Sequence, residues 1–233
     1  MKVLFSDTYN NRVRKIDRSG MISTIAGNGE REFNGDGHLA TSASLCSPAS
    51  VLQYKNEIYI ADSGNHRIRK IDQNGIISTI PKVRNNTICD YYFPMFIRND
   101  ELYFTDAVYQ LFKIPITNSG NIQTIAGIEK ERGFNGDDML ASKCKLNFPK
   151  GIFVDNDSQI FIADSFNNCI RKIDQNGMMR RVIGTAGQRG YSGDVPFDFR
   201  QYPHIGPRKK KPWIKPFPHA YHDLIVICSV ELD

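Results

Sequence analysis

The chain has 233 residues, of which 40% are hydrophobic and 24% are charged, and its formal net charge at pH 7 is +5. This composition is typical of a folded globular protein and excludes an intrinsically disordered chain. The excess of positive charge is too small to indicate, by itself, a nucleic-acid or membrane partner.

Cysteine content and hydropathy narrow the cellular setting. The five cysteines are scattered and odd in number, so we expect reduced thiols rather than a disulfide framework. No apolar run approaches the ~20 residues of a membrane helix. The start at Met1 is polar and has no signal-peptide core. The sequence therefore favours a cytoplasmic protein without a membrane partner.

Internal repetition is the main signal in residues 1–194. Four segments align, and each holds two short strand-like runs that are rich in β-branched and aromatic residues. The first run of each segment ends at an aspartate, and these residues are Asp7, Asp62, Asp106 and Asp164. Their spacing of 44 to 58 residues suits a four-stranded blade of a β-propeller plus a variable loop.

In chain order, the predicted blades span about residues 3–27, 48–82, 94–127 and 149–186. The first blade lacks its opening strand, and the other three are complete. A tight hairpin turn between the last two strands is indicated by Asn74-Gly75 and by Asn176-Gly177, because Asn-Gly supplies the positive φ angles. We therefore expect an all-β fold, an incomplete β-propeller of four-stranded antiparallel blades with a partial blade at each end.

A glycine-rich loop precedes two of the complete blades. It contains Phe33-Asn34-Gly35-Asp36-Gly37 and Phe134-Asn135-Gly136-Asp137, and Tyr191-Ser192-Gly193-Asp194 begins a third copy and a fifth blade. The structural interpretation is a tight turn in which the aspartate caps nearby N–H groups. The functional interpretation is a ring of recognition loops, with Asn34, Asp36, Asn135 and Asp137 as the candidate partner-binding residues.

Several motifs in this order resemble the NHL repeat family. The matching segments are Tyr59-Ile60-Ala61-Asp62, Asn65–Asp72, Ile25-Ala26-Gly27 and Phe33–Gly37, and residues 154–187 match again. The resemblance covers roughly residues 3–194. It implies a β-propeller, often six-bladed in the family, that acts as a protein- or RNA-binding module.

Family members often have six blades, whereas this sequence offers three complete blades and a partial one at each end. A closed propeller generally needs about four to eight blades, so this chain does not readily close a six-bladed ring. Open strand edges are a pairing hazard. Three explanations stay open: a fragment or incomplete gene model, which we favour; self-association that completes a ring through open blade edges; or an open arc stabilised by a partner.

The remaining segment, 195–233, is predicted to be an irregular tail rich in proline and lysine. Its basic run Arg208–Lys211 is more typical of a solvated segment than of a nucleic-acid patch. The pair His219 and His222 beside Asp223 offers too few ligands for zinc, which needs three or four.

We find no catalytic or metal-binding motif in this sequence, and we expect no catalytic residue, no cofactor and no metal. The once-per-blade aspartates suit a local turn cap better than a single active site. The leading hypothesis is a non-catalytic scaffold whose loops bind a protein.

Two alternatives follow from the family resemblance. One is RNA binding through a basic face that includes Arg14, Arg69 and Arg171. Strand alternation argues against it, because neighbouring side chains point to opposite faces. The other alternative is a propeller enzyme of lactonase or amidating-lyase type with a metal in its channel, for which the sequence shows no convergent ligand set.

Overall fold

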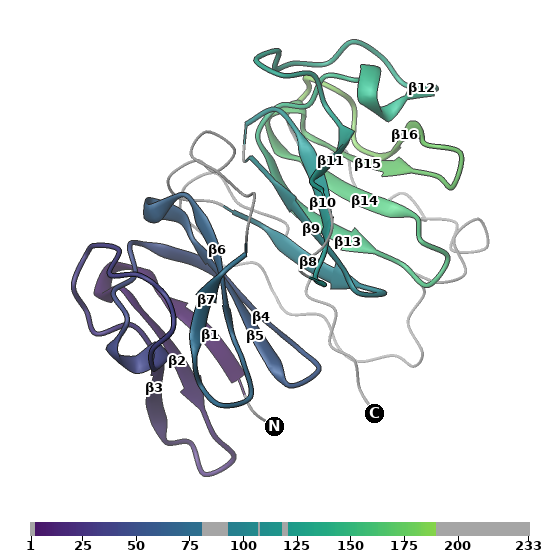
Figure 1. The fold of residues 1–233 in the computed structure, drawn as a ribbon. Coiled ribbons are helices and arrows are strands. Elements are labelled where there is room, and N and C mark those ends of the chain that lie inside the picture. Colours follow the sequence, from purple (N-terminus) through teal and green to yellow (C-terminus); the bar gives the residue numbers. More distant parts are fainter. Residues whose placement is uncertain (1–2, 81–92, 107, 118–120, 190–233) are drawn as a thin grey trace.

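Four antiparallel β-sheets follow one another along an open arc (Figure 1). The computed structural model describes residues 3–80, 93–106, 108–117 and 121–189. Within these ranges the chain forms strands and short 3₁₀ helices and no α-helix. The predicted all-β propeller class is confirmed. We call the sheets blade 1 to blade 4 in chain order.

The strands of each blade succeed one another by hairpins. Blade 1 holds β1 (Val3–Asp7), β2 (Arg12–Ile16) and β3 (Ile22–Ala26). Blade 2 holds β4 (Pro48–Tyr54), β5 (Glu57–Asp62), β6 (Arg67–Ile71) and β7 (Ile77–Thr79). Blade 3 holds β8 (Met95–Arg98), β9 (Glu101–Thr105), β10 (Leu111–Pro115) and β11 (Gln123–Ala126). Blade 4 holds β13 (Pro149–Val154), β14 (Ile160–Asp164), β15 (Cys169–Ile173) and β16 (Met178–Ile183), and β12 (Met139–Leu140) pairs with the outer edge of β16.

In blades 2 and 4 a single 3₁₀ turn links the second strand to the third. These turns are η3 (Ser63–Asn65) and η5 (Ser165–Asn167), and η1 (Thr8–Asn10) is their counterpart in blade 1. Two further turns, η2 (Ala40–Ser42) and η4 (Ala141–Lys143), lie in the glycine-rich loops. The residue after each hairpin turn is left-handed, with φ near +50° at Asn11, His66 and Asn168, and Asn and His are among the side chains that adopt this conformation most readily.

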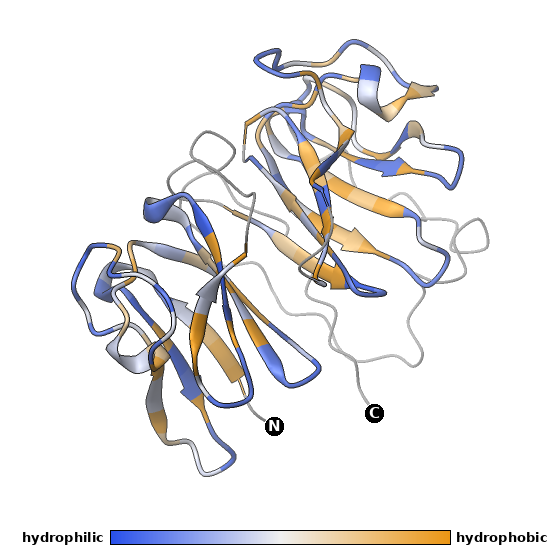
Figure 2. Cartoon of the chain, in the orientation of Figure 1, coloured by the Kyte–Doolittle hydropathy of each residue, from blue (hydrophilic) through white to orange (hydrophobic). Residues whose placement is uncertain are grey.

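Three apolar clusters hold neighbouring blades together, so the core lies between the sheets. Alternating side chains of one strand face opposite neighbours: Ile60 packs toward blade 1, whereas Tyr59 and Ala61 pack toward blade 3. Blades 3 and 4 enclose the third cluster, which includes Leu111 and Ile162. Figure 2 shows this as apolar bands along the strands and polar turns at their ends.

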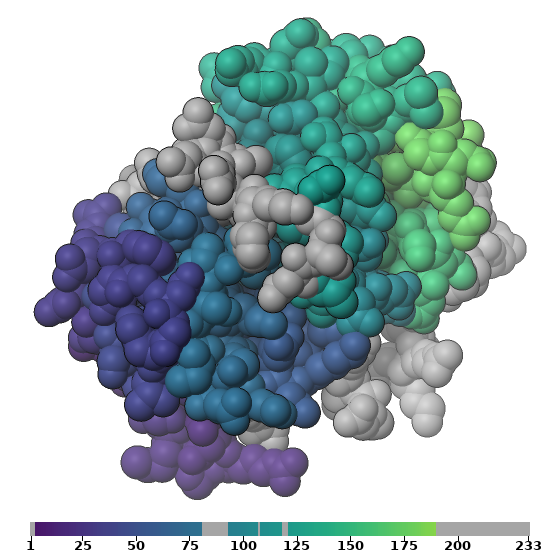
Figure 3. All heavy atoms as spheres, viewed as in Figure 1, coloured from purple at the N-terminus to yellow at the C-terminus, as the bar shows by residue number. Residues whose placement is uncertain are grey.

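Blade 1 and blade 4 lie at opposite ends of the arc, as the purple and green surfaces in Figure 3 show. The predicted fifth blade and the tail 195–233 lie outside the described residues. No helix in the described part of the chain is both long and apolar enough to cross a membrane. The cytoplasmic location stays a prediction.

A glycine closes the last strand of three blades at a point where backbones nearly touch. Gly27, Gly127 and Gly184 all have φ between +87° and +91°. A Cβ atom at these positions would overlap a backbone oxygen of the preceding hairpin, which belongs to Asn11, Tyr109 and Asn168 respectively. Both the conformation and the close approach therefore require glycine.

Replacing Gly27 with alanine tests this close approach, and Gly20 is a matched control. Gly20 has a similar φ of +87°, but no atom lies within 4 Å of the point that an added methyl group would occupy. We expect Gly20→Ala to cost about 1 kcal/mol of unfolding free energy and Gly27→Ala roughly 3 kcal/mol or more, because only the second also displaces backbone. Urea denaturation measures both, and equal losses would contradict the close-approach argument.

Candidate functional site

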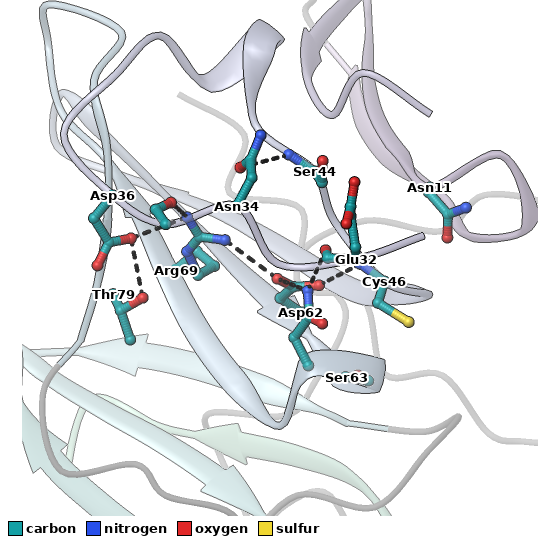
Figure 4. A network of polar contacts seen from close by, with 12 residues as sticks. Asn11, Glu32, Asn34, Asp36, Ser44, Cys46, Asp62, Ser63, Arg69 and Thr79 are labelled. Carbon is teal, nitrogen blue, oxygen red and sulfur yellow. Dashed lines mark hydrogen bonds and ion pairs between the residues drawn. The ribbon is translucent and has the colours of Figure 1, made fainter. Parts of the chain in front are cut away.

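The aspartate that ends β5 lies at the centre of a buried polar network (Figure 4). Its Oδ1 atom accepts a hydrogen bond from the backbone N–H of Cys46 at 2.7 Å. Its Oδ2 atom accepts one from Nδ2 of Asn65 at 2.8 Å and lies 3.4 Å from Nη1 of Arg69. Asp62 therefore joins three segments: the loop before β4, the turn η3 and the strand β6.

Arg69 extends this network from the blade to the glycine-rich loop. Its side chain is fully buried. Its Nη2 atom donates to the carbonyl oxygen of Gly35 at 2.6 Å and lies 3.0 Å from Oδ1 of Asp36. The guanidinium also lies over the ring of Phe33, 4.8 Å from its centroid. One arginine thus contacts the ring, the carbonyl and the carboxylate of the loop motif.

Blade 4 repeats this arrangement with Arg171. Asp164 accepts hydrogen bonds from the backbone N–H of Asn147 at 2.8 Å and from Nδ2 of Asn167 at 2.8 Å. Arg171 lies 3.4 Å from Asp164, donates to the carbonyl oxygen of Gly136 at 2.7 Å, and lies 3.1 Å from Oδ1 of Asp137. Its guanidinium is 4.9 Å from the centroid of Phe134. We call each set of aspartate, arginine and loop motif a loop clamp.

The loops themselves are cross-linked and join neighbouring blades. Asn34 accepts from the N–H of Ser44 at 3.0 Å and donates to the carbonyl of Ser42 at 3.1 Å. Asn135 makes the same pair of bonds with Lys145 and Lys143. The N–H of Gly27 at the end of blade 1 donates to the carbonyl of Ala40, whereas the N–H of Ala40 donates to the carbonyl of Gly75 in blade 2. Each loop therefore ties two outer strands together.

Blade 3 has the aspartate of the clamp but lacks its arginine and its loop motif. Phe112 occupies the register position of Arg69, opposite Phe104, and stacks on that ring at 5.4 Å. Asp106 instead caps its own turn by accepting from the N–H groups of Val108, Tyr109 and Gln110. The sequence 81–92 before this blade contains no Phe-Asn-Gly-Asp motif. The arginine and the loop motif therefore occur together or not at all in blades 2 to 4.

The side chains predicted to bind partners are engaged within the loops themselves. Asn34 and Asn135 hold the loop backbone, and Asp36 and Asp137 pair with the buried arginines, so contact of these four with a partner stays a proposal. Two of the three arginines predicted to form an exposed basic face lie in the interior instead. Arg69 and Arg171 are fully buried, so their guanidinium groups are not offered at the surface, and Arg14 is half-buried.

Sequence reasoning did not identify the side chains that the loops do expose. Leu39 is 54% exposed and Leu140 is 45% exposed, and each lies three residues after the aspartate of its motif. Phe33 and Phe134 are also partly exposed. The signal was present in the sequence as a leucine at the same place in both loops, where a purely structural turn needs no large apolar residue.

Burial is the largest influence on the pKa values of the two aspartates in this network. It raises the pKa of Asp62, and it raises the pKa of Asp164 to about 6, although the neighbouring amide and guanidinium donors act in the opposite direction. Burial also raises the pKa of the Cys169 thiol to about 12. A thiol in that state is a poor nucleophile at neutral pH, so this cysteine has a packing role.

A cavity of about 580 Å³ opens where the inner strands β4, β8 and β13 end. Its lining includes the rings of Tyr54, Phe96 and Phe153 and the side chain of Arg98. The carboxylate in this lining, Asp155, accepts from the N–H groups of Asp157 and Gln159. Among the described residues, no group of three or more His, Cys, Asp or Glu side chains is arranged to hold a metal ion.

Comparison with known proteins gives matches in sequence and in fold. The family model described as the teneurin NHL domain matches residues 82–198. Human Teneurin-1 is 30% identical over 185 residues, which is 72% of this chain but 6% of that protein. The chain therefore spans a small part of the length of this relative.

Solved structures of low sequence identity share the fold. A streptogramin B lyase aligns with a TM-score of 0.54 and 15% identity, covering 77% of this chain and 50% of the lyase chain. A chain of a nidogen–laminin complex aligns with a TM-score of 0.57 and 15% identity, covering 79% of this chain and 61% of that chain. At these identities the likeness concerns the fold alone.

Removing the arginine of a clamp is expected to lower the free energy of unfolding. Arg171→Met leaves Asp164 and Asp137 without their buried cation, and we expect a loss of about 3 kcal/mol in unfolding free energy. The matched control is Arg180→Met in β16, because the ion pair of Arg180 with Asp138 is exposed and contributes about 1 kcal/mol or less. Chemical denaturation compares them, and similar small losses for both would contradict the clamp.

The raised pKa of Asp164 predicts an unusual pH dependence. The unfolded value is about 3.9, so the folded protein takes up this proton at higher pH than the unfolded chain. The stabilising contribution is therefore complete below about pH 4 and is lost as pH rises through about 6. Asp164→Asn stays neutral and lacks it. We expect the stability difference between wild type and variant to shift toward wild type as pH falls from 7 to 4.5, and a constant difference would contradict this.

Proposed function

Because the chain belongs to the NHL repeat family, we propose that it is a non-catalytic protein-binding module whose two clamped loops contact the partner. The loops that run from Phe33 and from Phe134 occupy the same place in blades 2 and 4. Rigid loops that present side chains from a β-scaffold are a common form of recognition surface.

One observation carries the proposal: each clamped loop exposes large apolar side chains that the fold does not need to expose. Leu39 and Leu140 lie on the strand-like stretch that follows the motif, and each is about half exposed. The same loops also carry exposed charged residues, including Glu32 and Arg132. Protein interfaces commonly combine an apolar centre with a polar rim.

The clamp supports this proposal energetically. A loop that is ordered before binding loses less conformational freedom when a partner docks. Arg69 and Arg171 hydrogen-bond to the backbone of the loops, so the exposed leucines lie on an ordered backbone. A neighbour in fold was solved as a nidogen–laminin complex, which is a protein–protein assembly.

Catalysis and RNA binding have less support. The one carboxylate lining the described cavity is already used by backbone donors, and a channel metal needs several ligands. RNA binding through Arg69 and Arg171 conflicts with their full burial, because phosphate contacts need accessible cations.

Site-specific photo-crosslinking tests the proposal. A benzoylphenylalanine side chain at Leu39 or at Leu140, introduced into the chain expressed in its source cells, is expected to form a covalent adduct with the same partner protein. The matched control positions are Arg18 and Asn56, which are exposed on hairpin turns of blades 1 and 2, and they are expected to give no such adduct.

The loop variant Leu39→Asp combined with Leu140→Asp is expected to abolish adduct formation from a probe at Phe33. Unchanged circular dichroism checks that it folds. Adducts from the control positions alone, or cross-linking to RNA in place of protein, would overturn the proposal.

A further inference from the structure

The cavity of about 580 Å³ at the ends of β4, β8 and β13 is lined by three consecutive blades. A volume of this size is in the range that small-molecule ligands occupy. Strand β4 follows a glycine-rich loop and is 7 residues long. The cavity, at the far end of β4, therefore lies about 20 Å along the strand from that loop. It is a different place from the loops proposed to bind a protein.

Aromatic rings from each of the three blades form part of the cavity wall. Tyr54 comes from blade 2, Phe96 from blade 3 and Phe153 from blade 4. The rings of Phe96 and Phe153 meet edge to face, with their centroids 5.4 Å apart. All three side chains are only half-buried, so each keeps apolar surface that another flat apolar group would cover favourably.

The cation in this wall, Arg98, is uncommitted. It lies two residues after Phe96 on β8, so the two side chains share one face of blade 3. Arg98 is half-buried, and among the described residues it forms no hydrogen bond or ion pair. A positive charge at the edge of an apolar cavity therefore lacks a counter-charge from this part of the chain.

The carboxylates of the same hairpin and of the cavity wall are engaged elsewhere. Glu101 lies opposite Arg98 in the strand register, but its Oε1 atom lies 3.7 Å from Nζ of a lysine on β10. Asp100 lies 2.6 Å from Nζ of a lysine in blade 2. Asp155 in the wall is buried and accepts two backbone N–H bonds of its own hairpin. An anionic ligand is the remaining way to neutralise Arg98.

We propose that this cavity binds a small organic carboxylate with a flat apolar body. The carboxylate pairs with the guanidinium of Arg98, and the body packs against the rings of Phe96 and Phe153. This site is independent of the protein-binding loops, and one molecule can use both.

The geometry of arginine favours a carboxylate over a phosphate group. A guanidinium presents two parallel N–H donors that match the two oxygens of a carboxylate. One uncommitted arginine balances one negative charge, whereas a phosphate monoester carries about 1.5 to 2 charges at pH 7. The exposed amides of Gln53, Asn99 and Asn156 also line the cavity and offer donors and acceptors to polar substituents of the ligand.

Isothermal titration calorimetry of the full chain tests the site with two probes of one shape. 2-Naphthoate joins a carboxylate to a flat apolar ring system, and 2-naphthamide has the same shape without the charge. We expect saturable one-to-one binding of 2-naphthoate and binding of 2-naphthamide that is weaker by about 10-fold or more, because a hydrogen bond to a charged group is stronger than a neutral one.

Arg98→Gln is expected to weaken the binding of 2-naphthoate by about 10-fold or more and to leave that of 2-naphthamide unchanged. Unchanged binding of the neutral probe shows that the variant is folded. Arg98→Lys keeps the charge without the fork and is expected to bind 2-naphthoate with intermediate affinity. The matched control, Arg18→Gln, removes an exposed charge from a hairpin of blade 1 and is expected to change neither probe.

Phe153→Leu places the ligand body in this cavity, because it removes a ring that both probes contact. We expect both probes to bind more weakly by a similar factor, with the urea midpoint as the check on folding.

The proposal is overturned if 2-naphthoate shows no saturable binding, if the two probes bind equally well, or if Arg98→Gln and Arg18→Gln behave alike. These outcomes are distinct from those of the photo-crosslinking, because the cavity variants are expected to leave the adducts at Leu39 and Leu140 unchanged.

Discussion

The architecture depends on a buried guanidinium that holds a surface loop to the face of a blade. Arg69 and Arg171 are removed from water, and each is neutralised by a buried aspartate and by the carboxylate of the loop. Burying a charge is unfavourable unless it is paired and hydrogen-bonded. The buried arginine is therefore stable only where the loop supplies its acceptors, and the loop is held in place by the arginine. This mutual requirement explains why Phe112 replaces the arginine in blade 3, where the loop motif is absent from the sequence.

The clamp affects more than one blade because the loop that it holds bonds to two of them. Its backbone bonds to Gly27 on one side and to Gly75 on the other, so an interaction formed within one blade also fixes the position of the next. The same rigidity gives the exposed leucines a defined place on the outer rim. Under the proposed function, stability and recognition therefore draw on one set of contacts.

Much of this fold was predictable from sequence, because its determinants are local. Alternation of apolar residues and the Asn-Gly turns define strands and hairpins within a few residues of each other, and Asp106 caps its own turn as predicted. The burial of Arg69 and Arg171 was not predicted, because a charged residue on a strand suggests a solvated face. Their loop partners lie 33 to 35 residues earlier in the chain, and only the joint occurrence of arginine and loop motif signals the contact.

Native-state hydrogen exchange in Arg69→Met tests the central claim most directly. The amide of Ala40 donates to Gly75 within the loop clamped by Arg69, and the amide of Ala141 donates to Gly177 within the loop clamped by Arg171. The account predicts faster exchange at Ala40 and its neighbours, with Ala141 protected as in the wild type. Unchanged protection at Ala40, or an equal rise in both loops, would contradict it.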